Sequence, residues 1–308
     1  MVIGDGSGGG VYALEAATGR QRWSVSSSAV RGLAAADGLV YAGVAVTTGA
    51  TGGVMALSAD RGHVMWTAEF VRKQDTNGAL TVSRGVVYVT TSHGEIYAFR
   101  AASGRRLWRI AGRNVTFGAA PPLAAGGVVF ACSANKIPVL YAVRAATGGG
   151  LWQRSLGAAA FPAYLDVADG VVFAGLTRIS GSAGPNAGGL TARNAATGQL
   201  LWRVPVAGGV DLAPAVASGV AYTGSNNGVL DAWQAGTGIK LWSFSTAGLI
   251  GTNIAVARDI VYFGSSDNRV YAVAAQAPGG SGSSPATPLP SGPGSARIIE
   301  YAEYRPSG

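Results

Sequence analysis

The chain has 308 residues, of which 48% are hydrophobic and 12% are charged, and this is enough apolar material to bury a large core. No uninterrupted apolar stretch reaches the roughly 18 residues that a membrane-spanning helix requires, and the single cysteine, Cys132, excludes an intramolecular disulfide. The formal net charge of +8 arises without a long basic run or a nucleic-acid-binding motif. Specific nucleic-acid recognition is therefore not expected, whereas attraction to an anionic surface stays open.

Short apolar runs rich in Val, Tyr and Phe follow one another along the chain without helical periodicity. One kind of run ends at a turn such as Asp37-Gly38 or Ser218-Gly219; examples are Ala79–Ser83, Leu212–Ala217 and Asn253–Ala257. A second run follows each turn, and in chain order these are Val40–Gly43, Val86–Thr90, Val128–Cys132, Val171–Gly175, Val220–Gly224 and Ile260–Gly264. Both kinds are predicted to be β-strands bounded by tight turns.

A recurring motif comes after each pair of runs. It reads VYALEAATGRQRW from Val11 to Trp23 and returns as IYAFRAASGRRLW, LYAVRAATGGGLW, LTARNAATGQLLW and LDAWQAGTGIKLW, with a weaker copy VMALSADRGHVMW. The shared glycine and tryptophan are Gly19 and Trp23, Gly62 and Trp66, Gly104 and Trp108, Gly148 and Trp152, Gly198 and Trp202, and Gly238 and Trp242. A seventh copy starts at Val270 but lacks both the glycine and the tryptophan.

Each repeat is predicted to form four antiparallel strands, A to D. The motif supplies strands C and D, the Thr-Gly pair makes the C–D turn because glycine can adopt the positive φ needed there, and the tryptophan of strand D packs back over its own blade. One such unit cannot bury both of its faces alone, whereas radial stacking of neighbours does so. The predicted fold is an all-β propeller of four-stranded antiparallel blades, seven in number, or eight if the chain is truncated.

The motif resembles the tryptophan-docking repeat of quinoprotein-type (PQQ-like) β-propellers, whose pattern is Ala-x-Asp-x-x-Thr-Gly-x-x-x-Trp. The resemblance covers roughly residues 1–275. The acidic position of that pattern holds Glu15, Ser58, Arg100, Arg144, Asn194 and Gln234. The hydrogen bond made by the acid is therefore expected to be lost or replaced in most copies.

The two ends of the repeat array do not match. The first repeat begins in strand B and lacks strand A, so a missing N-terminal segment, with a secretion signal, is one expectation. Residues 1–276 are assigned to the propeller, 277–295 to a flexible Pro/Gly/Ser-rich linker and 296–308 to a C-terminal tail. Residues 297–304 of the tail have a strand-like pattern. They are either a frayed end or the start of a further segment, or they fold back as the outer strand that the last repeat lacks.

Candidate binding residues lie on the top face, which we define as the end of the blades formed by the B–C turns and the D–A connections. They are Lys73, Asp75, Asn77, Arg113, Asn114, Asn226, Asn227, Asp267, Asn268 and Arg269. The alternative is that these are ordinary polar turn residues, because Asn and Asp favour turns.

Catalytic constellations are nearly absent from the sequence. Neither histidine, His63 or His93, has a second ligand at metal-binding spacing. The glycine-rich run at residues 4–10 lacks the Gly-Lys-Ser/Thr of a phosphate-binding loop. No catalytic, cofactor-binding or metal-binding residue is assigned.

The resemblance implies a non-catalytic binding or scaffold protein, similar to BamB-type outer-membrane assembly lipoproteins and to the extracytoplasmic sensor propellers of bacterial kinases. Such a protein would be periplasmic or extracellular, a monomer, and would hold a protein partner or an extended ligand on its top face. The alternative is a PQQ- and Ca²⁺-dependent quinoprotein dehydrogenase or a degenerate relative. Those enzymes often use a vicinal cysteine pair, which Cys132 alone cannot form, and acids are scarce in the predicted top-face loops (Asp75, Asp211 and Asp267).

Overall fold

The computed structural model describes residues 2–5, 10–27, 30–44, 52–70, 80–112, 114–118, 120–135, 137–157, 160–178, 188–275 and 298–303. The chain divides into two compact units, Met1–Leu156 and Gly157–Gly308, which we call unit 1 and unit 2. Within the described ranges all regular structure is β-strand, and no helix there is long and apolar enough to cross a membrane.

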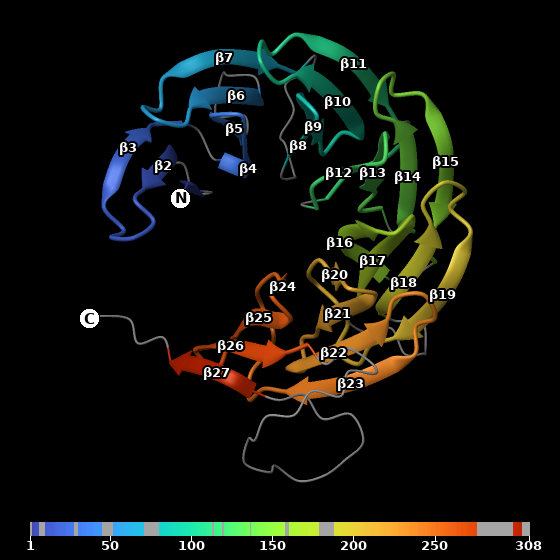
Figure 1. The fold of residues 1–308 in the computed structure, drawn as a ribbon. Coiled ribbons are helices and arrows are strands. Elements are labelled where there is room, and N and C mark those ends of the chain that lie inside the picture. The colour runs from blue at the N-terminus through green and yellow to red at the C-terminus, as the bar shows by residue number, and fades with distance from the viewer. Residues whose placement is uncertain are drawn as a thin grey trace. The chain divides into compact units, whose positions relative to one another are not determined.

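Unit 1 holds four antiparallel sheets, numbered 1 to 4 in chain order (Figure 1). Sheet 1 contains β1 (Val2–Asp5), β2 (Gly10–Leu14) and β3 (Gln21–Val25). Sheet 2 contains β4 (Val30–Ala36), β5 (Leu39–Val44), β6 (Gly53–Ser58) and β7 (Val64–Glu69). Sheet 3 contains β8 (Thr81–Ser83), β9 (Val86–Thr90), β10 (Glu95–Arg100) and β11 (Arg106–Ala111), and sheet 4 contains β12 (Leu123–Ala125), β13 (Val128–Cys132), β14 (Val139–Arg144) and β15 (Gly150–Ser155).

Unit 2 holds sheets 5 to 7. Sheet 5 contains β16 (Ala160–Ala168), β17 (Val171–Arg178), β18 (Gly189–Asn194) and β19 (Leu200–Pro205). Sheet 6 contains β20 (Ala215–Ala217), β21 (Val220–Gly224), β22 (Val229–Gln234) and β23 (Lys240–Ser245). Sheet 7 contains β24 (Ala255–Ala257), β25 (Ile260–Ser265), β26 (Arg269–Ala274) and β27 (Ile298–Glu303).

The strand order within each sheet follows the chain, so each sheet is a simple meander of strands A to D. Sheet 1 has three strands in the described residues and no strand A, as the sequence predicts. The predicted C–D turns are confirmed: each motif glycine has a positive φ, from 67° at Gly104 to 74° at Gly62.

The C-terminal segment supplies the outer strand of sheet 7. Strand β27 pairs antiparallel with β26, so the alternative of a frayed end is wrong. The pairing also repeats the register of the other outer strands, because Glu300 lies opposite Ala272 as Trp108 lies opposite Ala98. In sheet 7, as in every other sheet, strand D has one extra residue directly before the position that Glu300 holds. This extra residue forms a β-bulge.

The motif tryptophan packs over its own sheet, as predicted. In sheet 3 the Tyr88 and Trp108 rings lie 5.9 Å apart, and both residues pair with Ala98 between them. The same arrangement occurs in sheets 2, 4, 5 and 6. The motif alanine is therefore small because two aromatic rings meet across it.

The tryptophan also reaches the next sheet, which the sequence analysis did not predict. Trp108 donates a hydrogen bond of 2.8 Å from Nε1 to the carbonyl of Ala145 in sheet 4. Its ring covers Gly148, where an added Cβ would lie 2.8 Å from the indole. Equivalent bonds join Trp23 to Ala59, Trp66 to Ala101 and Trp202 to Ala235, so the motif ties consecutive sheets together.

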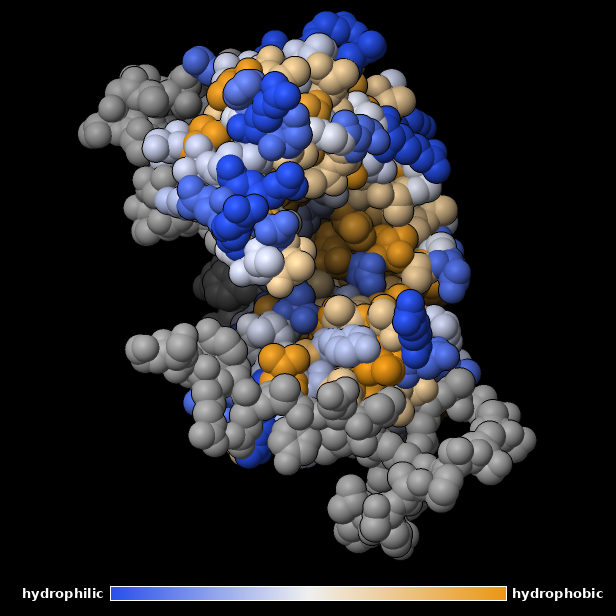
Figure 2. All heavy atoms as spheres, turned by 60° about the vertical axis from the view of Figure 1, so that its left-hand side comes forward, coloured by the Kyte–Doolittle hydropathy of each residue, from blue (hydrophilic) through white to orange (hydrophobic). Residues whose placement is uncertain are grey.

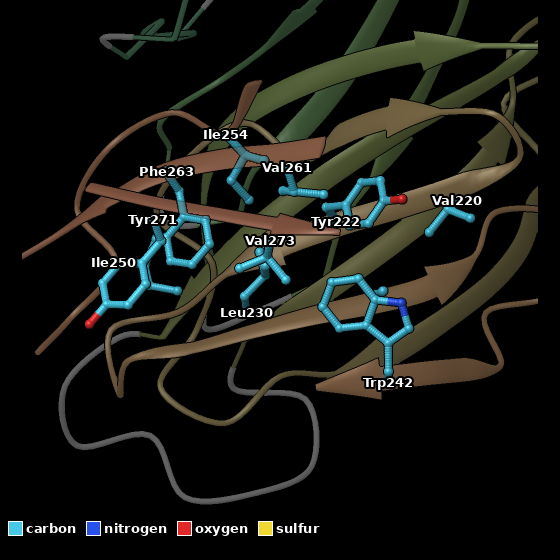
Figure 3. Packing of buried hydrophobic residues seen from close by; sticks show 11 residues of the cluster. Val220, Tyr222, Leu230, Trp242, Ile250, Ile254, Val261, Phe263, Tyr271 and Val273 are labelled. Carbon is cyan, nitrogen blue, oxygen red and sulfur yellow. The ribbon is translucent and has the colours of Figure 1, made fainter. Parts of the chain in front are cut away.

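The core lies between the facing sheets. In unit 2, eleven buried residues of sheets 6 and 7 and their connection form one cluster, in which Phe263 and Tyr271 lie side by side (Figure 3). Exposed apolar residues gather on the outer strands: Met65, Leu107, Leu151 and Leu201 each directly precede a motif tryptophan. These are the extra residues of the bulges, which turn outward because the bulge interrupts the alternation of the strand. Figure 2 shows hydrophobic and hydrophilic residues interspersed on one face of the molecule.

Candidate functional site

The top face of each unit is built from D–A connections that run past the B–C turn of the following sheet. Because neighbouring strands are antiparallel, these two kinds of segment leave the sheets from the same end. We call each pair of a D–A connection and the B–C turn of the following sheet a junction.

The junction in unit 1 joins the connection between sheets 3 and 4 to the B–C turn of sheet 4. Asn114 is exposed and has a φ of +56°. Its carbonyl accepts a hydrogen bond of 2.9 Å from Nδ2 of Asn135, and the Oδ1 of Asn135 accepts one of 3.0 Å from the backbone of Thr116. Asn114 thus takes part in holding two loops together through its main chain.

The first junction in unit 2 joins the connection after β19 to the B–C turn of sheet 6. Asn226 donates a hydrogen bond from Nδ2 to Oδ2 of Asp211, and Asn227 accepts one from Ser225. The other carboxylate oxygen of Asp211 is buried and has no hydrogen-bond partner among the described residues. An acceptor in this state is a position where a donor from water or from a ligand is expected.

The second junction in unit 2 centres on Asp267 in the B–C turn of sheet 7. Its carboxylate accepts hydrogen bonds of 2.7 Å from the Tyr271 hydroxyl and 3.3 Å from the backbone of Ala247. Burial acts to raise the pKa of Asp267, but these hydrogen bonds outweigh it and the pKa is lowered. The backbone of Arg269 donates to the same carboxylate, and Asn268 has a φ of +65°.

Four of the predicted site residues, Lys73, Asp75, Asn77 and Arg113, lie outside the described residues. The structure brings Asn226 and Asn227 together in one turn, and Asp267, Asn268 and Arg269 together in another. Asn114 lies in unit 1 and belongs to neither of these turns.

Sequence reasoning missed two buried carboxylates in strand C. Glu95 is 2% exposed and accepts a 2.6 Å hydrogen bond from Tyr97. It also forms an ion pair with Arg109, and the hydrogen bond that Arg109 donates to Glu95 is the main cause of the raised pKa of Arg109. Asp231 is 3% exposed and accepts hydrogen bonds of 2.8 Å from Lys240 and 2.6 Å from Ser243.

A sequence signal for Asp231 was present. Asp231 occupies the position that holds tyrosine in several copies of the motif, and an acid at an apolar position of a strand implies a buried partner. Lys240 also lies 4.7 Å from the ring centroid of Trp233.

The described residues contain no group of three or more His, Cys, Asp or Glu side chains that could hold a metal ion. Cys132 is buried in β13, and burial raises the pKa of its thiol.

Residues 7–175 and 186–277 match the family model described as outer membrane protein assembly factor BamB. The chain is 30% identical over 152 residues to the serine/threonine-protein kinase AfsK of Streptomyces coelicolor, a match that covers 49% of this chain and 17% of the kinase. The chain thus spans less than a fifth of the length of that relative.

Two solved structures share the fold. BamB from Moraxella catarrhalis superposes with a TM-score of 0.71 at 20% identity, covering 98% of this chain and 82% of that one. Quinohemoprotein alcohol dehydrogenase from Comamonas testosteroni gives 0.61 at 14% identity, covering 80% and 52%. The predicted all-β propeller of four-stranded antiparallel blades is confirmed, with seven sheets in the described residues. The chain belongs to the PQQ-like repeat family described as outer membrane protein assembly factor BamB.

Proposed function

We propose that this chain is a non-catalytic binding propeller that holds a protein partner on its top face. The observation that carries the proposal is the set of hydrogen-bonded junctions between loops. Asn226 is tied to Asp211, and Asp267 is tied to Tyr271 and Ala247, so the polar groups of unit 2 are fixed before any partner arrives. Preorganised groups lose little conformational entropy on binding, which favours a recognition surface.

The family description supports a role in protein assembly. The match to part of a kinase supports a second setting, in which such a propeller is one part of a larger protein. We propose that the propeller lies in the periplasm or outside the cell, where its formal charge of +8 would draw it towards anionic surfaces.

The test is a comparison of two lysine variants at opposite ends of sheet 6. Asn226→Lys changes an exposed top-face residue. Gly236→Lys is the matched control, because an added Cβ there meets nothing within 4 Å and the glycine lies in the C–D turn at the other end of the sheet. Partners are captured by crosslinking to the full chain in cells of its source and identified by mass spectrometry.

The proposal expects a partner that crosslinks to the wild type and to Gly236→Lys, and that is lost in Asn226→Lys. Equal capture by all three proteins, or loss only in Gly236→Lys, overturns the top-face assignment. Stoichiometric binding of PQQ with Ca²⁺, followed by dye reduction with an alcohol or sugar, would instead establish the dehydrogenase alternative.

A further inference from the structure

An apolar pocket of about 220 Å³ lies in unit 1 between sheets 3 and 4 (β10, β11 and β14 in Figure 1). Ile96 and Ile110 line it from sheet 3, Tyr141 and Val143 from sheet 4, and Phe117 from the connection between them. The lining residues Ala111, Gly112 and Gly150 are exposed, so the pocket opens to solvent along this rim. The pocket is larger than an engineered cavity of about 150 Å³ that takes up benzene.

The repeat explains why a pocket exists at this place. Sheets 6 and 7 carry Phe244 and Phe263 at the positions that Ile110 and Ala131 hold in sheets 3 and 4, as the strand registers show. Phe244 packs edge-on against Tyr271 at 5.5 Å, and Phe263 stacks on Tyr271 at 5.2 Å (Figure 3 shows the latter pair). Sheets 3 and 4 therefore have an isoleucine and an alanine where sheets 6 and 7 have two rings.

The consequence is visible in the core. The buried residues packed between sheets 6 and 7 form one continuous cluster, whereas those packed between sheets 3 and 4 fall into two. The pocket takes lining residues from both of these clusters, with Val143 from one and Ile96 and Phe117 from the other. The pocket thus lies beside positions that carry larger side chains elsewhere in the repeat.

Among the side chains that line the pocket, only that of Tyr141 carries a polar group. The equivalent hydroxyls of Tyr97 and Tyr271 each donate to a carboxylate of their own sheet, Glu95 and Asp267. Sheet 4 has Val139 and Ile137 at the corresponding positions, and the Tyr141 hydroxyl forms no hydrogen bond within the described residues. A hydroxyl of this kind can donate to a ligand.

We infer that this pocket binds a single aromatic ring that carries a hydrogen-bond acceptor. The ring takes the place that Phe244 fills in sheets 6 and 7, packed edge-on against Tyr141, and the acceptor accepts a hydrogen bond from the Tyr141 hydroxyl. The ring comes either from a free aromatic compound or from a phenylalanine of a partner, whose main-chain carbonyl is then the acceptor. The inference does not depend on what the top face binds.

The test uses acetophenone and toluene as probes. Ligand-detected NMR titration measures the binding of each probe to the full chain. The two rings are similar in size, and only acetophenone has a carbonyl acceptor. Acetophenone should bind the wild type about tenfold more tightly than toluene, the ratio expected for one hydrogen bond. Tyr141→Phe should bring the two affinities together without abolishing either.

Two variants locate the site. Ile110→Phe places in sheet 3 the ring that sheet 6 already has, and should weaken both probes at least about tenfold because the space is filled. Phe244→Leu is the converse change, and should add a second site per chain. That second site should not distinguish acetophenone from toluene, because the Tyr271 hydroxyl already donates to Asp267. Ala131→Phe serves in place of Ile110→Phe if that variant loses the wild-type circular dichroism spectrum.

A comparison of N-acetylphenylalanine amide with N-acetylalanine amide identifies the source of the ring. Binding of the phenylalanine amide alone assigns the pocket to a side chain of a partner, and binding of acetophenone but neither amide assigns it to a free aromatic compound. The inference is overturned if neither probe shows saturable binding to the wild type, or if a folded Ile110→Phe variant binds as the wild type does.

Discussion

At the residue scale, the glycine of each C–D turn in the middle of unit 1 is held by two independent constraints. Gly104 has a φ of +67°, which disfavours any side chain, and an added Cβ would lie 2.5 Å from the Trp66 ring. Gly85, in the A–B turn of the same sheet, has a φ of +72° and nothing within 4 Å of an added Cβ. Substitutions at Gly85 and Gly104 therefore separate the free-energy cost of backbone strain from that of a steric conflict with Trp66.

We expect Gly85→Ala to cost about 1–2 kcal/mol of unfolding free energy, the penalty for a left-handed residue with a side chain. Gly104→Ala should cost about 1–3 kcal/mol more, because the Trp66 ring must also move. Urea denaturation of both variants measures the difference. Equal losses of unfolding free energy in the two variants would show that the Trp66 indole moves at no free-energy cost.

The tryptophans offer a second comparison at this scale. Trp108 donates to the Ala145 carbonyl, whereas the buried Nε1 of Trp242 has no partner among the described residues. Trp108→Phe should therefore lose a hydrogen bond worth about 1 kcal/mol in addition to packing, and Trp242→Phe should lose packing alone. A double-mutant cycle with Gly148→Ala, which perturbs the Trp108 docking turn, measures the coupling; no coupling would contradict the docking role.

At the scale of elements, a carboxylate links two sheets of unit 2. Asp166 of β16 accepts hydrogen bonds of 2.8 Å from the backbone of Val167 and of Val216, the latter in β20. Burial raises the pKa of Asp166 from its ordinary value of 3.8, although both hydrogen bonds act to lower it. The folded state thus favours the protonated form, so the contribution of Asp166 to stability is full below pH 3.8 and declines as the pH rises through the raised pKa.

Asp166→Asn removes this ionisation. The unfolding free energy of the variant relative to the wild type should increase between pH 3.5 and pH 7, on the order of 1 kcal/mol per unit of pKa shift. Asp169→Asn, an exposed carboxyl in the same sheet, controls for net charge. Urea titrations at several pH values measure both, and a difference that falls with rising pH would show that the hydrogen bonds outweigh burial.

The candidate site could be predicted only in part at this scale. Asn226, Asn227 and Asp267 were identified because polar residues gather in turns, but their partners Asp211 and Ala247 lie in connections that contact them only after folding. Glu95 and Asp231 were missed because the repeat pattern is defined by its Gly and Trp. A single acid within an apolar strand then looks like a chance departure from the repeat.

At the scale of the whole molecule, the last sheet depends on a strand that is distant in sequence. Strand β27 follows β26 after 23 intervening residues and still adopts the register and bulge of the other outer strands. Without it, β26 would be an edge strand with unpaired backbone groups. The C-terminal segment is therefore a structural part of sheet 7.

Truncation after residue 295 should lower the midpoint of thermal unfolding and increase aggregation, because β26 loses its antiparallel partner. Truncation after residue 303 is the control, since it keeps all of β27. Differential scanning calorimetry and light scattering compare the two with the full chain. Identical behaviour of both truncations would show that β27 adds nothing to stability.

The sequence by itself determined the repeat, the four-strand unit, the C–D turns and the family, because these depend on local turn chemistry and on the alternation of side chains along a strand. Only the tertiary structure decided where the tryptophan of the Gly-x-x-x-Trp motif docks, and that Glu300 takes the register position of this tryptophan in sheet 7. It also decided that Ile110 and Ala131 leave a pocket between sheets 3 and 4, whereas Phe244 and Phe263 fill the core between sheets 6 and 7. The physical reason is that these features depend on which faces of neighbouring sheets meet, and a local pattern does not contain the volume left between two surfaces.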